Sequence, residues 1–172
     1  MLNLFKAALF VLLSANTVYF AVFGTASKAV DAAAWLTLLA LFEAEATFGD
    51  RLRVGRRRFA VRAARLVAAG GVIAAAIGYL LEDNALDAAN SALWILVVIL
   101  LEVELRWPAL AARNRYAFNT AAFGVFGALA VLVVLWAAAA MWVDAYDAAL
   151  WLVAYATIER DISRRAGTQH DS

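Results

Sequence analysis

Long apolar runs alternate with short polar segments along the whole chain. A helix that crosses a bilayer needs about 20 mostly apolar residues at 1.5 Å each, and six runs approach that length. Because the runs are continuous, rather than alternating between apolar and polar positions, they predict helices and not the strands of a membrane barrel. The predicted spans cover residues 4–24, 30–48, 62–81, 86–106, 117–142 and 145–160.

Composition supports this interpretation. Of the 172 residues, 66% are hydrophobic, whereas a soluble domain is about 45–50% apolar. Lipid is therefore the expected surrounding for most side chains. A single proline and the lack of a low-complexity linker predict one membrane domain over residues 1–172. The apolar run after Lys6 is long enough to span, so we expect an uncleaved first helix rather than a signal peptide.

The basic residues are distributed unevenly. Of the 15 Lys and Arg, all except Lys28 lie on one side of the predicted bundle, at span ends or in the longer connections. The positive-inside rule places that side, with both termini, in the cytoplasm. It also predicts a basic cytoplasmic loop at 50–65 and a cytoplasmic tail at 163–172. Abundant Ala and a preference for Arg over Lys favour a bacterial source, and hence a multi-pass protein of the inner membrane.

Seven Arg fall between Arg51 and Arg65. We expect contact with anionic lipid headgroups, at about 1 kcal/mol per basic residue near the surface. A voltage sensor would carry Arg at every third residue within a span, whereas three of these Arg are consecutive. Nucleic acid is not an expected partner, because the segment is short and tethered to the bilayer. The residues predicted to contact lipid are Arg51, Arg53, Arg56, Arg57 and Arg58.

The even-numbered spans share one pattern: Asp or Asn, three residues, Trp, seven residues, Glu, one residue, and Glu or Asp. Such self-similarity indicates a repeated structural unit. Here the unit is a helical hairpin used three times, over approximately 1–49, 59–106 and 115–162. All three hairpins point the same way. The sequence therefore predicts an all-α membrane protein of six helices, arranged as a pseudo-threefold bundle with both termini inside.

The residues that open the pattern have ordinary structural explanations. Asp31, Asn90 (or its neighbour Asp87) and Asp147 are predicted N-caps, which accept hydrogen bonds from the free amides of a first helical turn. The Trp one turn further along is expected in the aromatic belt at the membrane interface. These residues are Trp35, Trp94 and Trp151.

Acidic residues close the pattern, and two explanations for them stay open. Glu43, Glu102 and Glu159 follow its first residue by 12 positions, or about 18 Å of helix, which places them at one depth near the cytoplasmic face. Ionisable residues within a membrane mark ion and proton paths, so they could form a cation or proton site. Alternatively they pair with neighbouring Arg, as the spacing of Glu102 and Arg106 allows. The remaining acids of this group are Glu45, Glu104 and Asp161.

These features favour a small channel or transporter for a cation or proton. The alternative is a non-catalytic scaffold or accessory subunit of a larger membrane complex, as a homo-oligomer or with a membrane partner. An enzyme is not expected. The chain has no Cys, and its one His, His170, lies near the end of the sequence, so thiol nucleophiles and His-ligated haem or zinc are not expected in the bilayer. No cofactor is expected.

Overall fold

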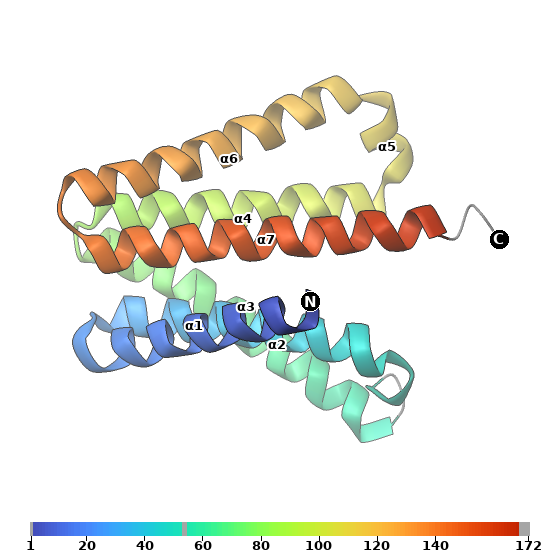
Figure 1. Cartoon of the computed structure of the whole chain (residues 1–172), viewed down its shortest axis with the longest axis horizontal. Coiled ribbons are helices and arrows are strands. Elements are labelled where there is room, and N and C mark those ends of the chain that lie inside the picture. Colours follow the sequence, from blue (N-terminus) through green and yellow to red (C-terminus); the bar gives the residue numbers. More distant parts are fainter. Residues whose placement is uncertain (1, 53–54, 169–172) are drawn as a thin grey trace. The chain divides into compact units, whose positions relative to one another are not determined.

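The chain is helical throughout the residues that the structure describes. The computed structural model describes residues 2–52 and 55–168 and contains no strand in these ranges. Figure 1 shows the helices in chain order. They are α1 (Leu2–Phe23), α2 (Ala26–Leu52), α3 (Gly55–Leu81), α4 (Ala85–Arg106), α5 (Pro108–Arg113), α6 (Arg115–Ala138) and α7 (Trp142–Thr168). The prediction of an all-helical chain is confirmed.

Among the described residues, four helices are long and apolar enough to cross a membrane. Their apolar segments are Leu4–Phe23 in α1, Arg56–Leu81 in α3, Ala85–Glu104 in α4 and Arg115–Ala138 in α6. The other two long helices, α2 and α7, have 27 residues each and carry acids towards both ends of their apolar stretch. The expected membrane character is supported by four helices, and spans in α2 and α7 remain a prediction.

Large apolar side chains cover much of the surface. Leu81 is 81% exposed, and Phe123 is 85% exposed. A soluble monomer rarely leaves contiguous apolar surface of this kind in water. Exposed apolar side chains on helices of this length are compatible with a membrane protein.

Several helices extend further than their apolar runs. α2 continues to Leu52 and α3 begins at Gly55, so helix replaces most of the loop expected at 50–65, while residues 53–54 lie outside the described part. α7 likewise continues to Thr168 through much of the expected tail, and residues 169–172 are not described. Arg, Glu and Ala are strong helix formers, so these polar segments prolong the helices beyond the expected membrane boundary.

The turns between helices contain residues with left-handed backbone. Asp83, between α3 and α4, has φ 53°, and Ala140, between α6 and α7, has φ 58°. In both turns a backbone amide returns to a carbonyl five residues earlier, from Asn84 to Tyr79 and from Met141 to Trp136, each at 2.9 Å, as in a helix-ending Schellman turn. The second turn lies before the connection expected at Val143–Tyr146. The short helix α5 was not predicted; its first residue is the single proline, which suits a helix start.

The chain forms two compact units, where the sequence suggested one domain. One unit comprises Met1–Asn16 and Leu129–Ser172, and the other comprises Thr17–Ala128. In the first, the Asn16 amide of α1 donates a hydrogen bond to Asp147 Oδ1 of α7 at 3.0 Å. Leu13 and Trp136 are buried in the same unit. Polar bonding between helices is the role expected for an Asn within a membrane segment.

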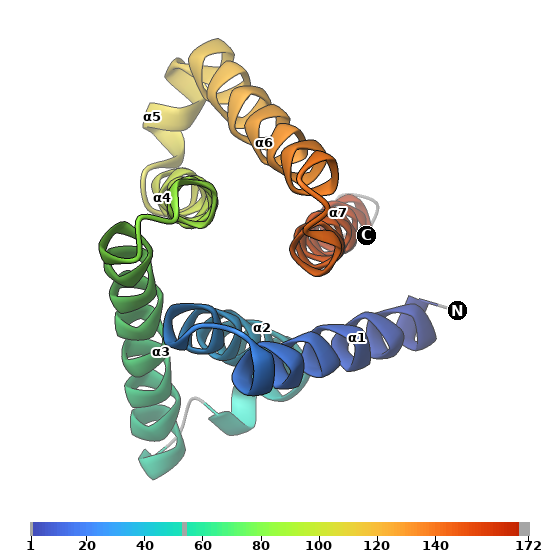
Figure 2. The same ribbon diagram turned by 90° about the vertical axis from the view of Figure 1, so that its left-hand side faces the viewer.

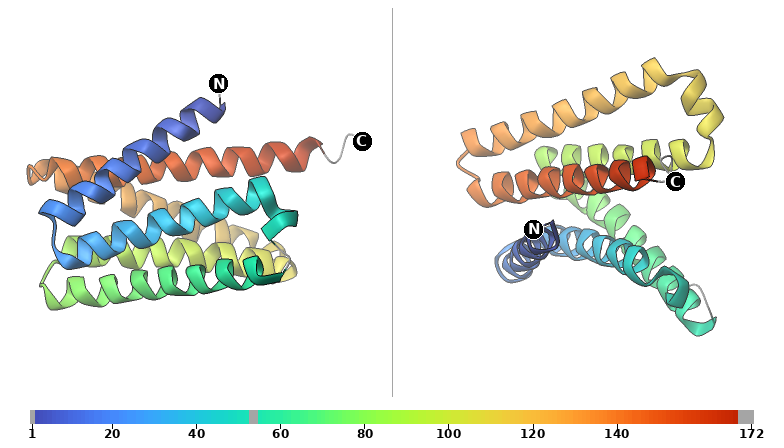
Figure 3. Two further views of the ribbon diagram at one scale, coloured as in Figure 1. Left: turned by 90° about the horizontal axis from the view of Figure 1, so that it is seen from below. Right: turned by 45° about the vertical axis from the view of Figure 1, so that its right-hand side comes forward.

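In the second unit, α3 packs along both α2 and α4. Helices α2 and α4 run in the same direction and α3 runs in the opposite one (Figure 3). The turn from α3 into α4 is visible in Figure 2. This arrangement brings the first turns of α2 and α4 to the same end of the unit as the last turn of α3.

Small residues allow α2 and α3 to approach closely. A Cβ placed on Gly78 would stand 2.1 Å from Ser27 Oγ, and one on Gly71 would stand 3.1 Å from Ala34 Cβ. Close approach through small residues is the usual way in which membrane helices pack. Gly78 therefore makes room for the Ser27 hydroxyl where α2 begins and α3 ends.

The variant Gly78→Ala is expected to lower stability by about 1–3 kcal/mol, because the added methyl group overpacks the α2–α3 contact. Gly70→Ala is the matched control: it lies on the same helix and nothing is within 4 Å of its added Cβ, so better helix propensity should leave stability unchanged or slightly higher. Thermal unfolding in detergent measures both. Equal behaviour of the two variants would contradict the close packing at Gly78.

Candidate functional site

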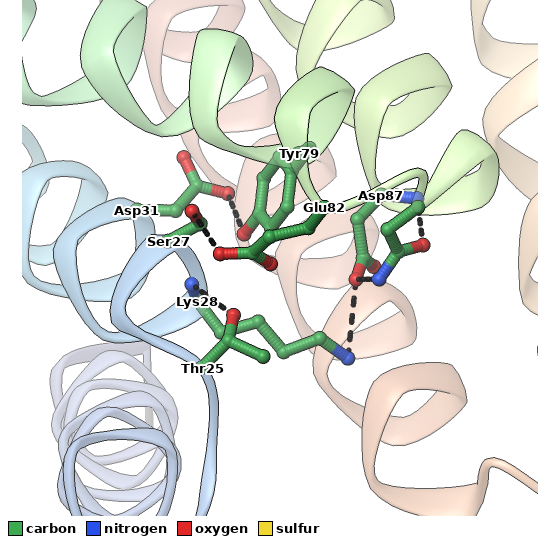
Figure 4. Close-up of polar contacts among 8 residues, drawn as sticks. Thr25, Ser27, Lys28, Asp31, Tyr79, Glu82 and Asp87 are labelled. Carbon is green, nitrogen blue, oxygen red and sulfur yellow. Dashed lines mark hydrogen bonds and ion pairs between the residues drawn. The ribbon is translucent and has the colours of Figure 1, made fainter.

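Polar side chains, several of them buried, gather where α2 begins, α3 ends and α4 begins. Figure 4 shows the centre of this group, with Lys28 and Asp31 from α2, Tyr79 and Glu82 from the end of α3, and Asp87 from α4. The whole group is called the polar cluster below. It consists of Ser27, Lys28, Asp31, Tyr79, Glu82, Asn84, Asp87, Asn90 and Ser91.

An ion pair joins α2 to α4. Lys28 Nζ lies 3.2 Å from Asp87 Oδ2, and the two side chains are only 13% and 8% exposed. The Lys28 ammonium also lies 5.7 Å from the centre of the Phe20 ring, a favourable position for a cation. Leaving one member of such a pair buried without the other costs several kcal/mol. The pair therefore holds the two helices at a fixed register.

Asp87 is also stabilised by its place in α4. It is the third residue of the helix, where a negative charge is favoured by the helix dipole. Its backbone amide donates to Asn84 Oδ1 at 3.3 Å, and Asn84 Nδ2 donates back to its carboxylate at 2.5 Å. The Asn84 side chain thus caps the helix and also holds the Asp87 carboxylate. It fixes the Asp87 side chain for its contact with Lys28.

Two hydrogen bonds link α2 to α3. The Tyr79 hydroxyl donates to Asp31 Oδ2 at 3.1 Å, and Asp31 is 9% exposed. The Ser27 hydroxyl donates to Glu82 Oε1 at 2.6 Å. This hydrogen bond is the main reason why the pKa of Glu82 lies below its ordinary value. Glu82 therefore stays ionised at the exposed rim, while Asp31 lies further in.

A ring contact marks the inner boundary of the polar cluster. The centres of the Trp35 and Trp94 rings are 6.0 Å apart. Trp35 follows Lys28 by seven residues, and Trp94 follows Asp87 by seven. Because the two helices run in the same direction and contact each other at both of these positions, they are in equal register. Asp31 and Asn90 each lie four residues before their Trp and are therefore level with each other.

Two polar atoms of α4 lack a partner at this level. Asn90 Oδ1 and Ser91 Oγ are buried, and neither atom has a hydrogen-bond partner among the described residues. Ser91 is 0% exposed. Buried polar atoms are nearly always paired with protein or water. At 100° per residue, Asp87, Asn90, Ser91 and Trp94 fall within about 100° of the helix surface, so these atoms share the face that carries the contacts to α2.

The predicted caps are wrong in position. Asp31, Asn90 and Asp147 each lie five residues after the first residue of their helix, beyond the first turn. The cap of α4 is Asn84. Helix α2 begins at Ala26 and α7 at Trp142, before the starts expected at residues 30 and 145. The residues that open the pattern are therefore interior helix residues: Asp31 bonds to Tyr79, and Asp147 bonds to Asn16.

The three patterned Trp have different environments. Trp94 is buried, while Trp35 and Trp151 are partly buried. The contact between Trp35 and Trp94 shows that these two rings serve helix packing. For Trp151, interfacial placement stays a prediction.

Two of the acids predicted near the cytoplasmic face, Glu45 and Glu102, form salt bridges with Arg. Arg65 donates to Glu45 at 2.5 Å, and Arg106 pairs with Glu102 at 2.5 Å through the expected spacing of four residues. Glu43 is half-buried, and Glu104 is exposed. The side chains of Glu159 and Asp161 lie outside the described residues. Among those described, no group of three or more Asp, Glu or His side chains could hold a metal ion.

The Arg residues expected at lipid headgroups are described in part. Arg56, Arg57 and Arg58 are exposed in the first turn of α3, and Phe59 beside them is 77% exposed. Charged and apolar groups side by side suit an interface between lipid and water. The side chain of Arg51 and the whole of Arg53 lie outside the described residues.

Sequence reasoning missed most of the polar cluster. Its residues are spread over three helices, and Tyr79 resembles any aromatic residue of a span. One signal was present: the residue seven positions before each patterned Trp is Lys28, Asp87 or Asp144. Opposite charges at equivalent positions of parallel helices predict a contact between them. Extending the pattern by three residues would have found the Lys28–Asp87 pair.

The single variants Lys28→Met and Asp87→Asn are each expected to lower stability by about 3–5 kcal/mol, because each leaves a buried charge without its partner. The double variant should lose clearly less than the sum of the two. Glu102→Gln, which breaks an exposed pair, serves as the control and should cost about 0–1 kcal/mol. Unfolding in detergent measures the cycle. Additive losses, or single losses no larger than that of the control, would show that the ion pair does not hold α2 to α4.

Comparison of the chain with protein-family models, with curated proteins and with solved structures finds no match. The functional argument therefore rests on the chemistry of the described residues in a chain whose helices have the length and apolarity of membrane spans.

Proposed function

We propose that this chain is a small multi-pass membrane protein that moves a proton or a small cation across the bilayer through the polar cluster. The observation that carries this proposal is the burial of Asp31, Asp87 and Lys28 between apolar helices. Burying charge away from water is costly. Ionisable residues in membrane helices commonly mark ion and proton paths.

The charge balance of the cluster supports a positively charged substrate. Residues 7–50 contain one basic residue, Lys28, and residues 66–105 contain none. The acids of the cluster are Asp31, Glu82 and Asp87, so carboxylates outnumber ammonium groups at this end of the unit. An excess of carboxylate attracts protons or cations and repels anions.

The acids on the opposite end of the helices fit a structural role better. Glu45 and Glu102 form salt bridges with Arg65 and Arg106 on the exposed surface. Exposed pairs of this kind contribute little free energy and carry no sign of a binding site. We therefore place the transport site at the polar cluster and assign these acids to the cytoplasmic rim.

Six membrane helices in three hairpins, with both termini in the cytoplasm of a bacterial cell, remain part of this proposal. The equal register of α2 and α4 supports a repeat, because equivalent residues of two hairpins contact each other at Trp35 and Trp94. Anionic lipids are the proposed partners of the exposed Arg in α3. A non-enzymatic role fits the lack of Cys and of a His within the helices.

Flux in proteoliposomes tests the function. The native chain is expected to conduct protons or an alkali cation under an imposed voltage, and Asp31→Asn should lower the flux by about tenfold or more, since it removes the buried charge of the path. Glu102→Gln is the control and should keep its flux. Loss of flux in Glu102→Gln but not in Asp31→Asn would indicate that the transport site is formed by the cytoplasmic acids instead. No flux from any of them would favour the scaffold or accessory subunit.

Cysteine labelling tests the topology. The chain has no native Cys, so single variants report without background. Asp83→Cys, in the exposed turn between α3 and α4, should react with an impermeant maleimide applied to intact cells. Arg57→Cys, at the start of α3, should react only after the membrane is opened. Labelling of both positions from outside, or the reverse pattern, would contradict the proposed orientation.

A further inference from the structure

Four side-chain donors of the polar cluster have partners within it. Lys28 pairs with Asp87, Tyr79 donates to Asp31, Ser27 donates to Glu82 and Asn84 donates to Asp87. The unpartnered atoms are Asn90 Oδ1, which can only accept, and Ser91 Oγ. The partner that Asn90 Oδ1 requires must therefore be a donor or a cation.

These two oxygens lie between two contacts that join α2 and α4. The Lys28–Asp87 pair is one turn nearer the helix starts, and the Trp35–Trp94 contact is one turn further in. Asp31 is level with Asn90 by the equal register of the helices, and Tyr79 of α3 fixes one of its oxygens. A carboxylate, an amide oxygen and a hydroxyl thus occupy one level, with an ion pair on one side and two indole rings on the other.

We propose that this level is a binding site for one monovalent alkali cation, with the Asp31 carboxylate, Asn90 Oδ1 and Ser91 Oγ as ligands. Hard cations prefer such oxygen ligands. This inference rests on the proposed function, because the alkali cation would be the substrate transported through the same site. Binding itself is measurable without transport.

The charges favour a monovalent cation over a divalent one. Lys28 pairs with Asp87 one turn nearer the helix starts, and Asp31 is the carboxylate at the level of Asn90 and Ser91. Calcium takes six to eight oxygen ligands, usually with several carboxylates. Among the described residues no group of three or more acidic or His side chains is placed to hold a metal. One carboxylate with neutral oxygens matches a single positive charge.

Thermal unfolding of the purified full chain tests the site, with sodium, lithium, potassium or choline chloride at one ionic strength. A ligand that binds only the folded state raises the midpoint in a saturable manner. The native chain should show this rise with at least one alkali cation and not with choline. For Ser91→Ala, the cation concentration that gives the same rise in the midpoint should be at least about tenfold higher, because the variant loses one ligand. Thr37→Val is the matched control, because the Thr37 hydroxyl bonds to Ala33 O of its own helix.

Ser91→Ala also guards against a variant that fails to fold. Removing an unpartnered buried hydroxyl is expected to leave the protein at least as stable in choline as the native chain, so a lost cation response is not a lost fold. Asp31→Asn should abolish the response. Equal shifts of the midpoint with choline and alkali salts would contradict the proposed site. An unchanged response in Ser91→Ala would also contradict it, and would indicate that bound water pairs with Ser91 and Asn90.

Failure of the site and failure of the proposed function give different results. Alkali binding without flux would keep the site and reject transport. Proton flux that depends on Asp31, with no alkali response, would keep transport and reject the alkali site in favour of a proton. In that case the charged and titratable groups around Asp31 would be Lys28, Tyr79, Glu82 and Asp87, on the three helices of the cluster.

Discussion

The cost of removing charge from water is the constraint on which this structure depends. Lys28, Asp31 and Asp87 are buried where α2, α3 and α4 meet, beside long apolar segments of α3 and α4. A buried charge is tolerated when partners surround it, and each of these has one from another helix. The same contacts set the relative position of the helices. Packing and chemistry are therefore inseparable at this end of the unit.

Equal register of α2 and α4 follows from two contacts of different kinds. The ion pair at Lys28 and Asp87 and the ring contact at Trp35 and Trp94 are separated by the same seven residues on both helices. Between them lie short polar side chains, two of which carry unpartnered buried oxygens. Gly78 lets Ser27 approach α3 on the adjacent side. The ion pair and the two Trp rings thus hold α2 and α4 together. The short side chains of Asn90 and Ser91 place their oxygen atoms between these contacts, at the level of Asp31.

Apolar runs predicted the helices well, because length and apolarity depend on local sequence alone. Ends were less accurate where polar helix formers continued a helix, as in α2 up to Leu52, and where a left-handed residue such as Ala140 made an early turn. The pattern beginning at Asp31 identified residues that meet in space, but it gave them the role of caps. Their partners, Tyr79 and Asn16, lie on other helices and have no local signature.

The cytoplasmic acids illustrate the limit of reasoning from depth. Glu102 was expected at a common level with other acids, and that argument used only its distance along the helix. Its neighbour Arg106, four residues on, offers a partner at lower cost than any arrangement between helices. A buried site needs groups that local neighbours cannot satisfy. Asp31 differs from Glu102 in that a residue of another helix, Tyr79 of α3, donates a hydrogen bond to it.

We infer that the Asp31 carboxylate is the charged ligand of a site within the membrane. Infrared difference spectroscopy on the chain in lipid, between sodium and choline buffers, reports directly on this group. The account predicts a shifted carboxylate band in the native chain that is absent from Asp31→Asn. An unchanged spectrum on addition of sodium, or a band that persists in Asp31→Asn, would contradict it.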